Sequence, residues 1–343
     1  MSLAVYLLAA CVAGSQFALA APSTTPALRF GKDGTFQLSV FEDLHFGEAE
    51  NLGWGPQQDF NSTRVMNSVL STESQQLVVL NGDLITGENT YLANSSHYMD
   101  QIVAPLVQRN RPWASTLTQS LVSSPNAGVS NYYIPVYSSS SSRTPALLLW
   151  FFDSRGGNYF QQLGFNGLPV PQPNWVDQSV VAWFQKTNTA LTRKHNNIIP
   201  SVAFVHIPVN AMLAFQIQGV DAHREPGIND DVPLVQQGYT QGQGEVSGTA
   251  FTYSGQDIPF MSALLETQEL MAVFSGHDHG DDWCMKWEGK LPGMNLTGNG
   301  LDLCFGRHSG YGGYGSWMRG SRQVKIREGL GRWRRGLGLK MGV

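Results

Sequence analysis

Short apolar runs that are typical of buried strands recur along the chain, and four of them stop directly at polar residues. The runs cover residues 35–41, 76–80, 146–152, 202–205 and 270–274. Continuous apolar runs are expected of strands that are covered on both faces. Sheets of this kind carry their functional side chains at the carboxyl ends of the strands. The pattern therefore predicts a layered α/β fold with a site at one edge of its sheets.

Amphipathic stretches lie between the apolar runs and predict the helices that connect the strands. They cover residues 59–74, 95–108 and 175–193, with the helical period that lets one face pack on a sheet. Residues 236–255 are rich in Gly, Gln, Ser and Thr, and they predict a long loop at the mouth of the site or on the surface.

The composition excludes several classes of protein. The chain has 343 residues, 42% of them hydrophobic and 14% charged, which is enough apolar material for a full core and excludes a largely disordered protein. No run of eighteen apolar residues occurs, so no membrane-spanning helix is expected. The net charge is −4, but residues 319–343 hold eight Lys or Arg and one Glu. The rest is acidic, which argues against nucleic-acid binding, and the basic, Gly-rich end is expected to be a solvated tail.

The first residues predict export from the cytoplasm. An apolar run over residues 3–13 is followed by Phe17-Ala18-Leu19-Ala20, which fits a signal peptide spanning residues 1–20; a short buried or anchoring helix is the alternative. Cleavage would remove Cys11 and leave Cys284 and Cys304. In an oxidising compartment this pair predicts one disulfide that closes a loop of about 20 residues.

Three Asn-x-Ser/Thr tripeptides agree with a secreted or vacuolar glycoprotein. They place candidate glycosylation sites at Asn61, Asn94 and Asn295. Such tripeptides also arise by chance, so it is their combination with the apolar leader that favours export.

Metal-ligand residues follow four of the apolar runs. Asp43-Leu44-His45, Gly82-Asp83, His206 and Gly276-His277-Asp278-His279 occur in this order. Carboxylate and imidazole ligands suit divalent Zn, Mn or Fe. A carboxylate such as Asp83 can bridge two ions about 3.5 to 4 Å apart, and two ions can activate a water and neutralise a phosphoryl group. The constellation predicts a phosphoester hydrolase, and Gly82 and Gly276 allow the tight turns that aim the next side chain.

These motifs resemble those of the calcineurin-like metallophosphoesterases, specifically a secreted or vacuolar fungal and plant branch that is similar to size-reduced purple acid phosphatases. The likeness continues through residues 303–308 and 310–315 and covers roughly residues 27–326. It implies one domain over that range and leaves residues 327–343 as a disordered tail. The implied fold is a four-layer αββα sandwich of two mixed sheets flanked by helices.

The resemblance also implies how two divalent ions would be held. One ion would bind Asp43, His45 and His279, with Asp83 as the bridge. The second would bind Asp83, His206 and His277. The purple members carry a Tyr three residues after the bridging Asp, where this chain has Thr86, so a colourless centre is expected.

One part of the family pattern is missing. A Gly-Asn-His-Asp/Glu block, whose Asn binds the second ion and whose His assists the leaving oxygen, is expected after residues 112–117. Thr118-Gln119-Ser120-Leu121 follows there instead, and no Asn-His dipeptide occurs in the chain. A helix/strand region is therefore predicted to be deleted after residue 117, or altered by the gene model. A weaker second ion site and slower turnover are expected.

The sequence thus predicts a metal-dependent phosphatase-type hydrolase that uses a metal-bound hydroxide on a phosphorylated small molecule or phosphoprotein. The alternative is a catalytically degenerate, secreted metal-binding glycoprotein of the same fold. Other hydrolase and nucleotide-binding classes are not supported, because the chain lacks a Gly-x-Ser-x-Gly elbow, a Walker loop and a His-Glu-x-x-His helix.

Overall fold

A computed structural model of the chain describes residues 27–72, 74–87, 92–115, 120–140, 143–231, 236–241 and 251–328. The predicted signal peptide lies outside these residues. So do residues 329–343 of the basic tail, the centre of the predicted loop at 242–250, and residues 116–119, where the family block would begin.

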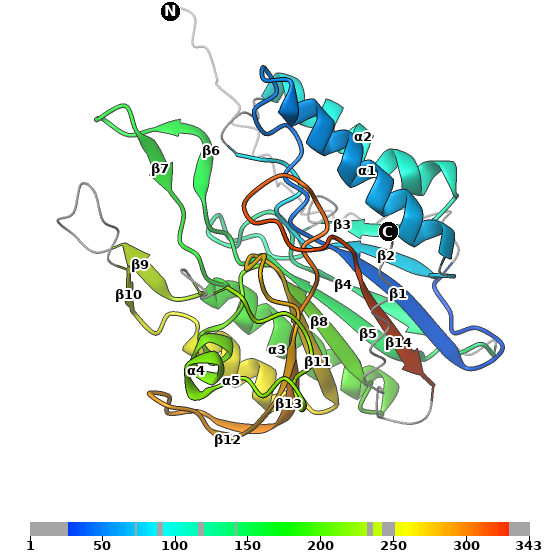
Figure 1. Cartoon of the computed structure of the whole chain (residues 1–343). Helices are drawn as coiled ribbons and strands as arrows, with labels where there is room; N and C mark the ends of the chain where they lie inside the picture. The colour runs from blue at the N-terminus through cyan, green and yellow to red at the C-terminus, as the bar shows by residue number, and fades with distance from the viewer. Residues whose placement is uncertain are drawn as a thin grey trace, which may run out of the picture.

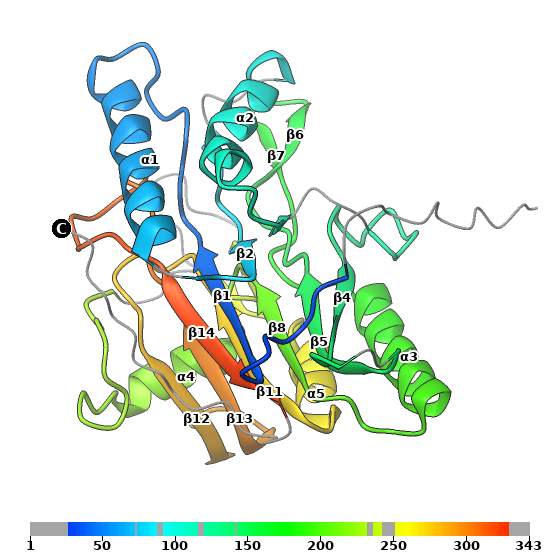
Figure 2. The same ribbon diagram turned by 90° about the vertical axis from the view of Figure 1, so that its right-hand side faces the viewer.

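Two mixed sheets face each other (Figures 1 and 2). The four-stranded sheet has the order β14-β1-β2-β3, with β1, β2 and β3 parallel and β14 antiparallel at the edge. Its strands are β1 (Thr35–Phe41), β2 (Leu77–Leu80), β3 (Trp113–Ser115) and β14 (Arg322–Arg327). The six-stranded sheet has the order β12-β13-β11-β8-β5-β4, in which β13, β11, β8 and β5 are parallel. Its strands are β4 (Tyr132–Tyr137), β5 (Pro145–Phe152), β8 (Ser201–Val205), β11 (Leu270–Ser275), β12 (Cys284–Lys290) and β13 (Thr297–Phe305).

Helices cover the outer face of each sheet. On the four-stranded sheet they are α1 (Trp54–Thr72) and α2 (Leu92–Gln108). On the six-stranded sheet they are α3 (Gln178–His195), α4 (Asn210–Gln218) and α5 (Ile258–Glu266). The Asp177 side chain caps α3 by accepting a hydrogen bond from the Ser179 amide, and Asn196 ends that helix in a left-handed conformation.

Three separate hydrophobic clusters define the layers. One joins α1 and α2 to the four-stranded sheet, through residues such as Met66 and Val78. A second lies between the sheets, where Leu38 and Phe204 are buried. The third joins the six-stranded sheet to its helices, for example through Phe184. Because each cluster fills the space between two layers, the predicted four-layer αββα sandwich is confirmed.

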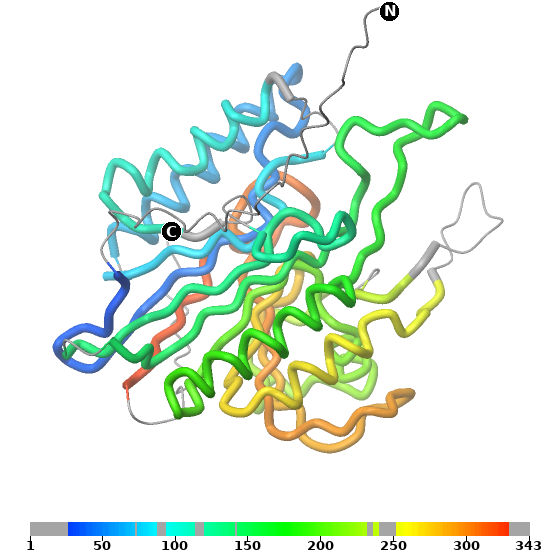
Figure 3. The backbone as a smooth tube through the Cα atoms, turned by 180° about the vertical axis from the view of Figure 1, so that it is seen from behind, coloured from blue at the N-terminus to red at the C-terminus, as the bar shows by residue number. Residues whose placement is uncertain are grey.

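The apolar runs identify β1, β2, β5, β8 and β11, and the amphipathic stretches identify α1, α2 and α3. The predicted long loop is partly wrong, because β9 (Tyr239–Gln241) and β10 (Phe251–Tyr253) pair within it. A further two-stranded sheet, β6 (Asn158–Leu163) with β7 (Pro169–Pro171), projects from the body in Figures 1 and 3. Residues 120–131, between β3 and β4, contain turns and no helix or strand.

The start of the basic tail is ordered, contrary to the prediction of a solvated end beginning at residue 319. Arg319 is buried and donates to the carbonyl oxygens of Trp317 and Gly315. Arg322 donates to the carbonyl oxygen of Phe305 at 2.8 Å. The charges are tolerated because each guanidinium satisfies main-chain acceptors, which lets β14 close the four-stranded sheet against β1.

The predicted disulfide is confirmed. Cys284 and Cys304 are direct cross-strand partners in β12 and β13, and they form a bond across a sequence separation of 20 residues. Both side chains are buried, and the bond joins the start of β12 to the end of β13, at the end of the hairpin away from its turn. A cross-link of this length restricts the unfolded chain and stabilises the folded one.

Replacing both cysteines, Cys284→Ala with Cys304→Ala, should lower the free energy of unfolding by about 2 to 4 kcal/mol. Guanidinium titration followed by tryptophan fluorescence measures the change. Reductant should leave the free energy of unfolding of the variant unchanged. It should lower that of the wild type by an amount similar to the effect of the two substitutions. A difference below about 0.5 kcal/mol would show that the bond adds little to stability.

Candidate metal centre

Four strand ends converge at one edge of the sandwich. Residues after β1 supply Asp43 and His45, and residues after β2 supply Asp83. From the other sheet, residues after β8 and β11 supply the histidines His206, His277 and His279. Because the strands are parallel within each sheet, their carboxyl ends share this edge, as the sequence pattern predicts.

All six predicted ligand residues come together, in two groups. Asp43, His45 and His279 form one group, and Asp83, His206 and His277 form the other; within each group the donor atoms all lie within 4.8 Å of one another. Asp83 Oδ2 also lies 3.6 Å from His45 Nε2. Asp83 therefore reaches both groups, which is the position that a bridging carboxylate needs.

Main-chain carbonyl groups determine which imidazole nitrogens face the centre. His206 Nδ1 lies 2.9 Å from the Asn81 carbonyl oxygen, and His279 Nδ1 lies 2.9 Å from that of Tyr314. A carbonyl oxygen can only accept, so each Nδ1 carries a hydrogen, and each Nε2 presents a lone pair once it holds no proton of its own.

These inward lone pairs fit a cation. His206 Nε2 is buried and forms no hydrogen bond with proper geometry, although Asp83 Oδ2 is 3.1 Å away. His45 Nε2 and His279 Nε2 approach each other to 3.2 Å. Lone pairs at this separation repel unless a proton or a metal ion lies between them. The donor set therefore fits divalent ions of the zinc, manganese or iron kind.

The two sheets are tied together at this edge by the ligand residues themselves. The His277 amide donates to Asp43 Oδ1 at 3.0 Å, and the Gly276 amide donates to the His206 carbonyl oxygen, also at 3.0 Å. On the other sheet, the His45 amide donates to the Asp83 carbonyl oxygen at 2.9 Å. Each ligand loop is thus fixed by its neighbours before any ion binds.

Four of the six ligand residues have left-handed backbone conformations. The φ angles are 54° at Asp43, 47° at His45, 42° at Asp83 and 77° at His277. Side chains with a Cβ are strained in this region by about 1 to 3 kcal/mol each. The surrounding strands enforce the strain, and it aims the side chains toward one point.

Two glycines permit the close packing of these loops. Gly82 has a φ of 103°, and a Cβ there would lie 2.4 Å from His206 Cγ. A Cβ at Gly276 would lie 2.8 Å from Asp43 Oδ2. The prediction of a tight turn applies to Gly82, whereas Gly276 is needed because the Asp43 carboxylate approaches it closely.

Burial and the neighbouring charges set the protonation of the second group. Burial by itself would raise the pKa of Asp83, but the charges of His206 and His45 hold the pKa of that carboxyl well below its usual range. Burial opposes the charging of His206, yet the Asp83 carboxylate raises the pKa of that imidazole to about 10. Burial and the His206 charge lower the pKa of His277 to about 4. Without metal, the His206 imidazole of this group therefore stays protonated and positively charged.

Aromatic residues that the sequence analysis left out of the site support His279. The His308 ring centroid lies 3.7 Å from that of His279, and the Tyr314 ring stacks on His279 at 4.1 Å. His308 is buried. Burial and the neighbouring His279 charge lower its pKa. The sequence feature that could have indicated these contacts is the glycine-rich run that follows His308. A Cβ at Gly313 would lie 2.4 Å from His279 Cε1, so a glycine is needed there.

A buried acid behind the centre was also missed. Glu42 accepts a hydrogen bond from Asn81 Nδ2 at 2.9 Å, and a Cβ at Gly306 would clash with its carboxyl group. Burial, together with the nearby Asp43 charge, raises the pKa of Glu42 well above its usual range. Asn81 Nδ2 also donates to the Phe274 carbonyl oxygen at 3.3 Å, so this amide links Glu42 to β11.

The buried asparagine of residues 120–131 does not replace the amide of the missing block. Asn131 Nδ2 donates to the Ala127 carbonyl oxygen at 2.6 Å, and Asn131 Oδ1 accepts from the Asp153 amide at 3.0 Å. One end of this amide is used within its own loop and the other by the residue that follows β5.

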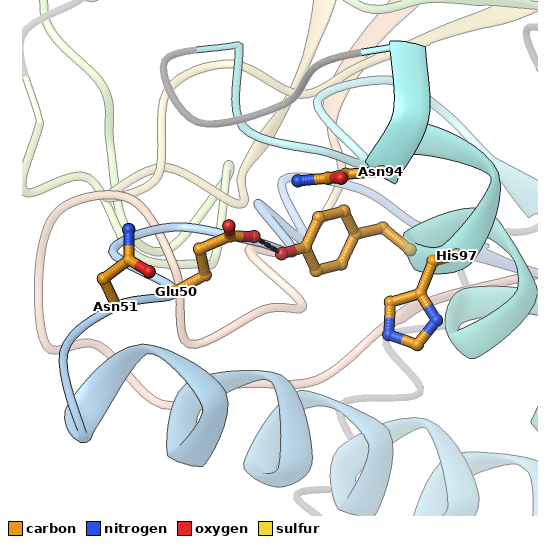
Figure 4. A pocket seen from close by; sticks show the side chains of 5 residues that line it. Glu50, Asn51, Asn94 and His97 are labelled. Carbon is orange, nitrogen blue, oxygen red and sulfur yellow. Dashed lines mark hydrogen bonds between the residues drawn. The ribbon is translucent and has the colours of Figure 1, made fainter.

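A polar cavity lies between the loop that follows His45 and the start of α2 (Figure 4). It measures about 490 Å³ and is lined by Glu50, Asn51, Asn94, His97 and Tyr98. The Tyr98 hydroxyl donates to the Glu50 carboxylate, and burial with this contact raises the pKa of Tyr98 to about 12.

The three candidate glycosylation sites differ in exposure. The Asn295 side chain is exposed, whereas Asn61 and Asn94 are half-buried. Glycosylation at these sites stays a prediction.

Comparison with known proteins was made by family, sequence and structure. No family model matches the chain. Two *Arabidopsis thaliana* proteins named "Probable inactive purple acid phosphatase" are similar. Number 29 is 27% identical over 96% of this chain and 86% of its own length, and number 14 is 26% identical over 89% and 79%. "Phosphatase DCR2" of Saccharomyces cerevisiae is 26% identical over 80% of this chain, which spans 48% of that protein.

Among solved structures, a dimetal phosphatase from Danio rerio has a TM-score of 0.51 at 14% identity, covering 85% of this chain and 93% of its own. At this identity the likeness concerns the fold. The sequence relatives, the fold and the strand-end motifs agree with one another, and together they relate this chain to the calcineurin-like metallophosphoesterases.

Proposed function

We propose that this chain is a metal-dependent phosphoesterase with a centre for two divalent ions. The observation that carries the proposal is the convergence of six donor residues in two groups, with Nε2 of His206 and of His279 turned inward by main-chain contacts at Nδ1. One ion would be held by Asp43, His45 and His279, and the other by His206 and His277, with Asp83 shared. Two such ions supply Lewis acidity toward a phosphoryl oxygen and lower the pKa of water.

The chain's own residues prepare the site for this chemistry. The His277 amide orients the Asp43 carboxylate, and the carbonyl groups of Asn81 and Tyr314 fix the tautomers of His206 and His279. Asp83 is the most exposed of the six ligands, with 42% of its side chain accessible, so it lies on the side from which a phosphate ester enters.

The substrate class is a phosphorylated small molecule or a phosphoprotein, because metal ligands recognise only the phosphoryl group. Turnover is expected to be slow, since loss of a positioned acid lowers a rate by about 10² to 10⁴. We further propose that the protein is secreted or vacuolar. The leader pattern and the disulfide support this location, and no helix among the described residues is long and apolar enough to cross a membrane.

A second candidate function is that of a catalytically degenerate metal-binding glycoprotein. The absence of the Asn-His pair favours it, and so do the names of the Arabidopsis relatives, which describe those proteins as probably inactive. The two candidates share the metal centre and differ in turnover, so one pair of measurements separates them.

The substitution Asp83→Asn should abolish metal-dependent hydrolysis of p-nitrophenyl phosphate, because it removes the carboxylate that reaches both groups. The matched control Asp100→Asn, at an exposed position of α2, should keep the wild-type rate. Chelation should stop the wild type, and added metal should restore it. Bound metal without turnover in the wild type would instead establish the second candidate.

The substitution Gly82→Ala should lower metal occupancy, because the new Cβ would displace the His206 ring and strain a φ of 103°. Gly87→Ala is the matched control, since nothing lies within 4 Å of its Cβ position. Elemental analysis of both purified proteins gives the readout without reference to activity. Equal metal content in the two variants would contradict the placement of His206 in the centre.

Metal affinity should rise by about tenfold per pH unit between pH 6 and 8, because an ion must displace a bound proton. The sign follows from the raised pKa of His206, about 10, which keeps the metal-free site protonated over this range. Calorimetric titration with Mn²⁺ in buffers of different ionisation enthalpy would count the released protons. An affinity that does not change with pH would rule out a protonated metal-free site.

A further inference from the structure

The β6–β7 hairpin rises from the same edge of the sandwich as the candidate metal centre. It follows β5, whose carboxyl end is parallel and adjacent to that of β8. At its base, a Cβ on Gly156 would lie 2.5 Å from Ile207 Cδ1, and Ile207 directly follows His206. Figures 1 and 3 show the hairpin extending away from the layered body. A six-residue strand reaches about 20 Å at roughly 3.3 Å per residue.

The outer part of this hairpin exposes large apolar side chains. Phe160, Leu163, Phe165 and Leu168 are each more than half exposed, and Phe165 is fully exposed. All four lie within a span of nine residues, 160–168. Single exposed apolar residues are ordinary on protein surfaces, but a group of this kind on a projection marks an interaction site.

The hairpin carries no side chain that is charged at neutral pH over residues 156–176. Asp, Glu, Lys, Arg and His are all missing from this stretch, although 14% of the whole chain is charged. Charged side chains oppose entry into an apolar medium, because they lose their hydration. The tip of the hairpin has no such charge to desolvate.

The hairpin tip also satisfies several of its main-chain groups internally. The Gly164 amide donates to the Leu168 carbonyl oxygen at 2.8 Å, and the Gly167 amide donates to that of Gly164 at 2.9 Å. The Leu168 amide donates to Asn166 Oδ1 at 3.1 Å. Unpaired amides are costly where water is excluded, so a turn that pairs them is suited to such a place.

The hairpin base has the residues expected at a boundary between water and lipid. Tyr159 and Trp175 are half-buried there, and Arg155 lies 5.7 Å over the Trp175 ring while donating to its carbonyl oxygen. Amphipathic aromatic rings favour the headgroup level of a membrane. Val129, which is 68% exposed, lines a cavity of about 370 Å³ at this base.

We propose that the β6–β7 hairpin docks the protein on a neutral lipid surface, with Leu163, Phe165 and Leu168 inserted among the acyl chains. A protein partner or a second copy would need a concave, uncharged surface to cover this convex tip. A bilayer deforms around it and accepts apolar side chains to a depth of about 5 to 10 Å. Because the hairpin shares an edge with the centre, docking brings that edge toward the membrane. The proposal does not require turnover at the centre.

Flotation of the full chain with phosphatidylcholine vesicles tests this proposal. The wild type should float with the vesicles, and the double variant Phe165→Asp with Leu168→Asp should partition at least about tenfold more weakly, since each 1.4 kcal/mol changes the constant tenfold. Ile217→Asp is the matched control, because Ile217 is 71% exposed at the end of α4, and it should float like the wild type. Hydrolysis of soluble p-nitrophenyl phosphate should be the same in all three proteins.

Four outcomes would overturn the proposal. The wild type could fail to float, or the double variant could float like the wild type. The protein could instead bind only anionic vesicles, with binding that salt abolishes and that the hairpin variant retains. That result would assign the contact to the basic tail. Light scattering could show that the wild type is a dimer and that Phe165→Asp makes it a monomer. That result would mean that the hairpin binds a second copy of the chain. Circular dichroism confirms that each variant is folded, and Phe165→Ser alone should give an intermediate loss.

Discussion

The strained convergence of six candidate ligand residues at one edge of the sandwich is the constraint on which the rest of the structure depends. Two carboxylates and four imidazoles come within a few ångströms of one another, and the ligand loops hold them there through left-handed backbone conformations. Such an arrangement costs free energy in the absence of a cation. It persists because the ligand loops from the two sheets hydrogen-bond to each other and because three apolar clusters hold the layers in place. The stability of the sandwich therefore holds these loops in their strained backbone conformations.

The fold and the convergence of the six candidate ligand residues could be predicted from the sequence, for a physical reason. Strands buried on both faces must be apolar throughout, so their ends are visible as a change to polar residues, and parallel strands bring those ends together. His308 and Tyr314 could not be assigned in this way, because their importance comes from contacts with His279 across 29 and 35 positions of the chain. Strand β14 was hidden for another reason: its buried residues Val324 and Ile326 alternate with basic and polar ones, inside a segment whose charge suggests solvation.

The segment between β3 and β4 shows how a departure from a family pattern can leave the fold intact. The four-stranded sheet ends at β3, a strand of three residues, and the chain then crosses to the edge of the other sheet. Asn131 stabilises this crossing with both ends of its amide. The six candidate ligand residues come from other strands, so the proposed metal site and the missing leaving-group residues belong to separate parts of the chain.

The disulfide lies close to the centre along the chain, and this has a consequence for how samples of the protein are prepared. Cys284 follows His279 by five residues, and Cys304 precedes His308 by four, so the bond joins the two segments that hold the His279 ring. A bacterial cytoplasm keeps thiols reduced. Protein produced there would have these segments linked by the β12–β13 ladder alone, whereas refolding in a glutathione redox buffer or periplasmic expression would restore the covalent link. The choice of expression host therefore decides which form of the centre an activity assay examines.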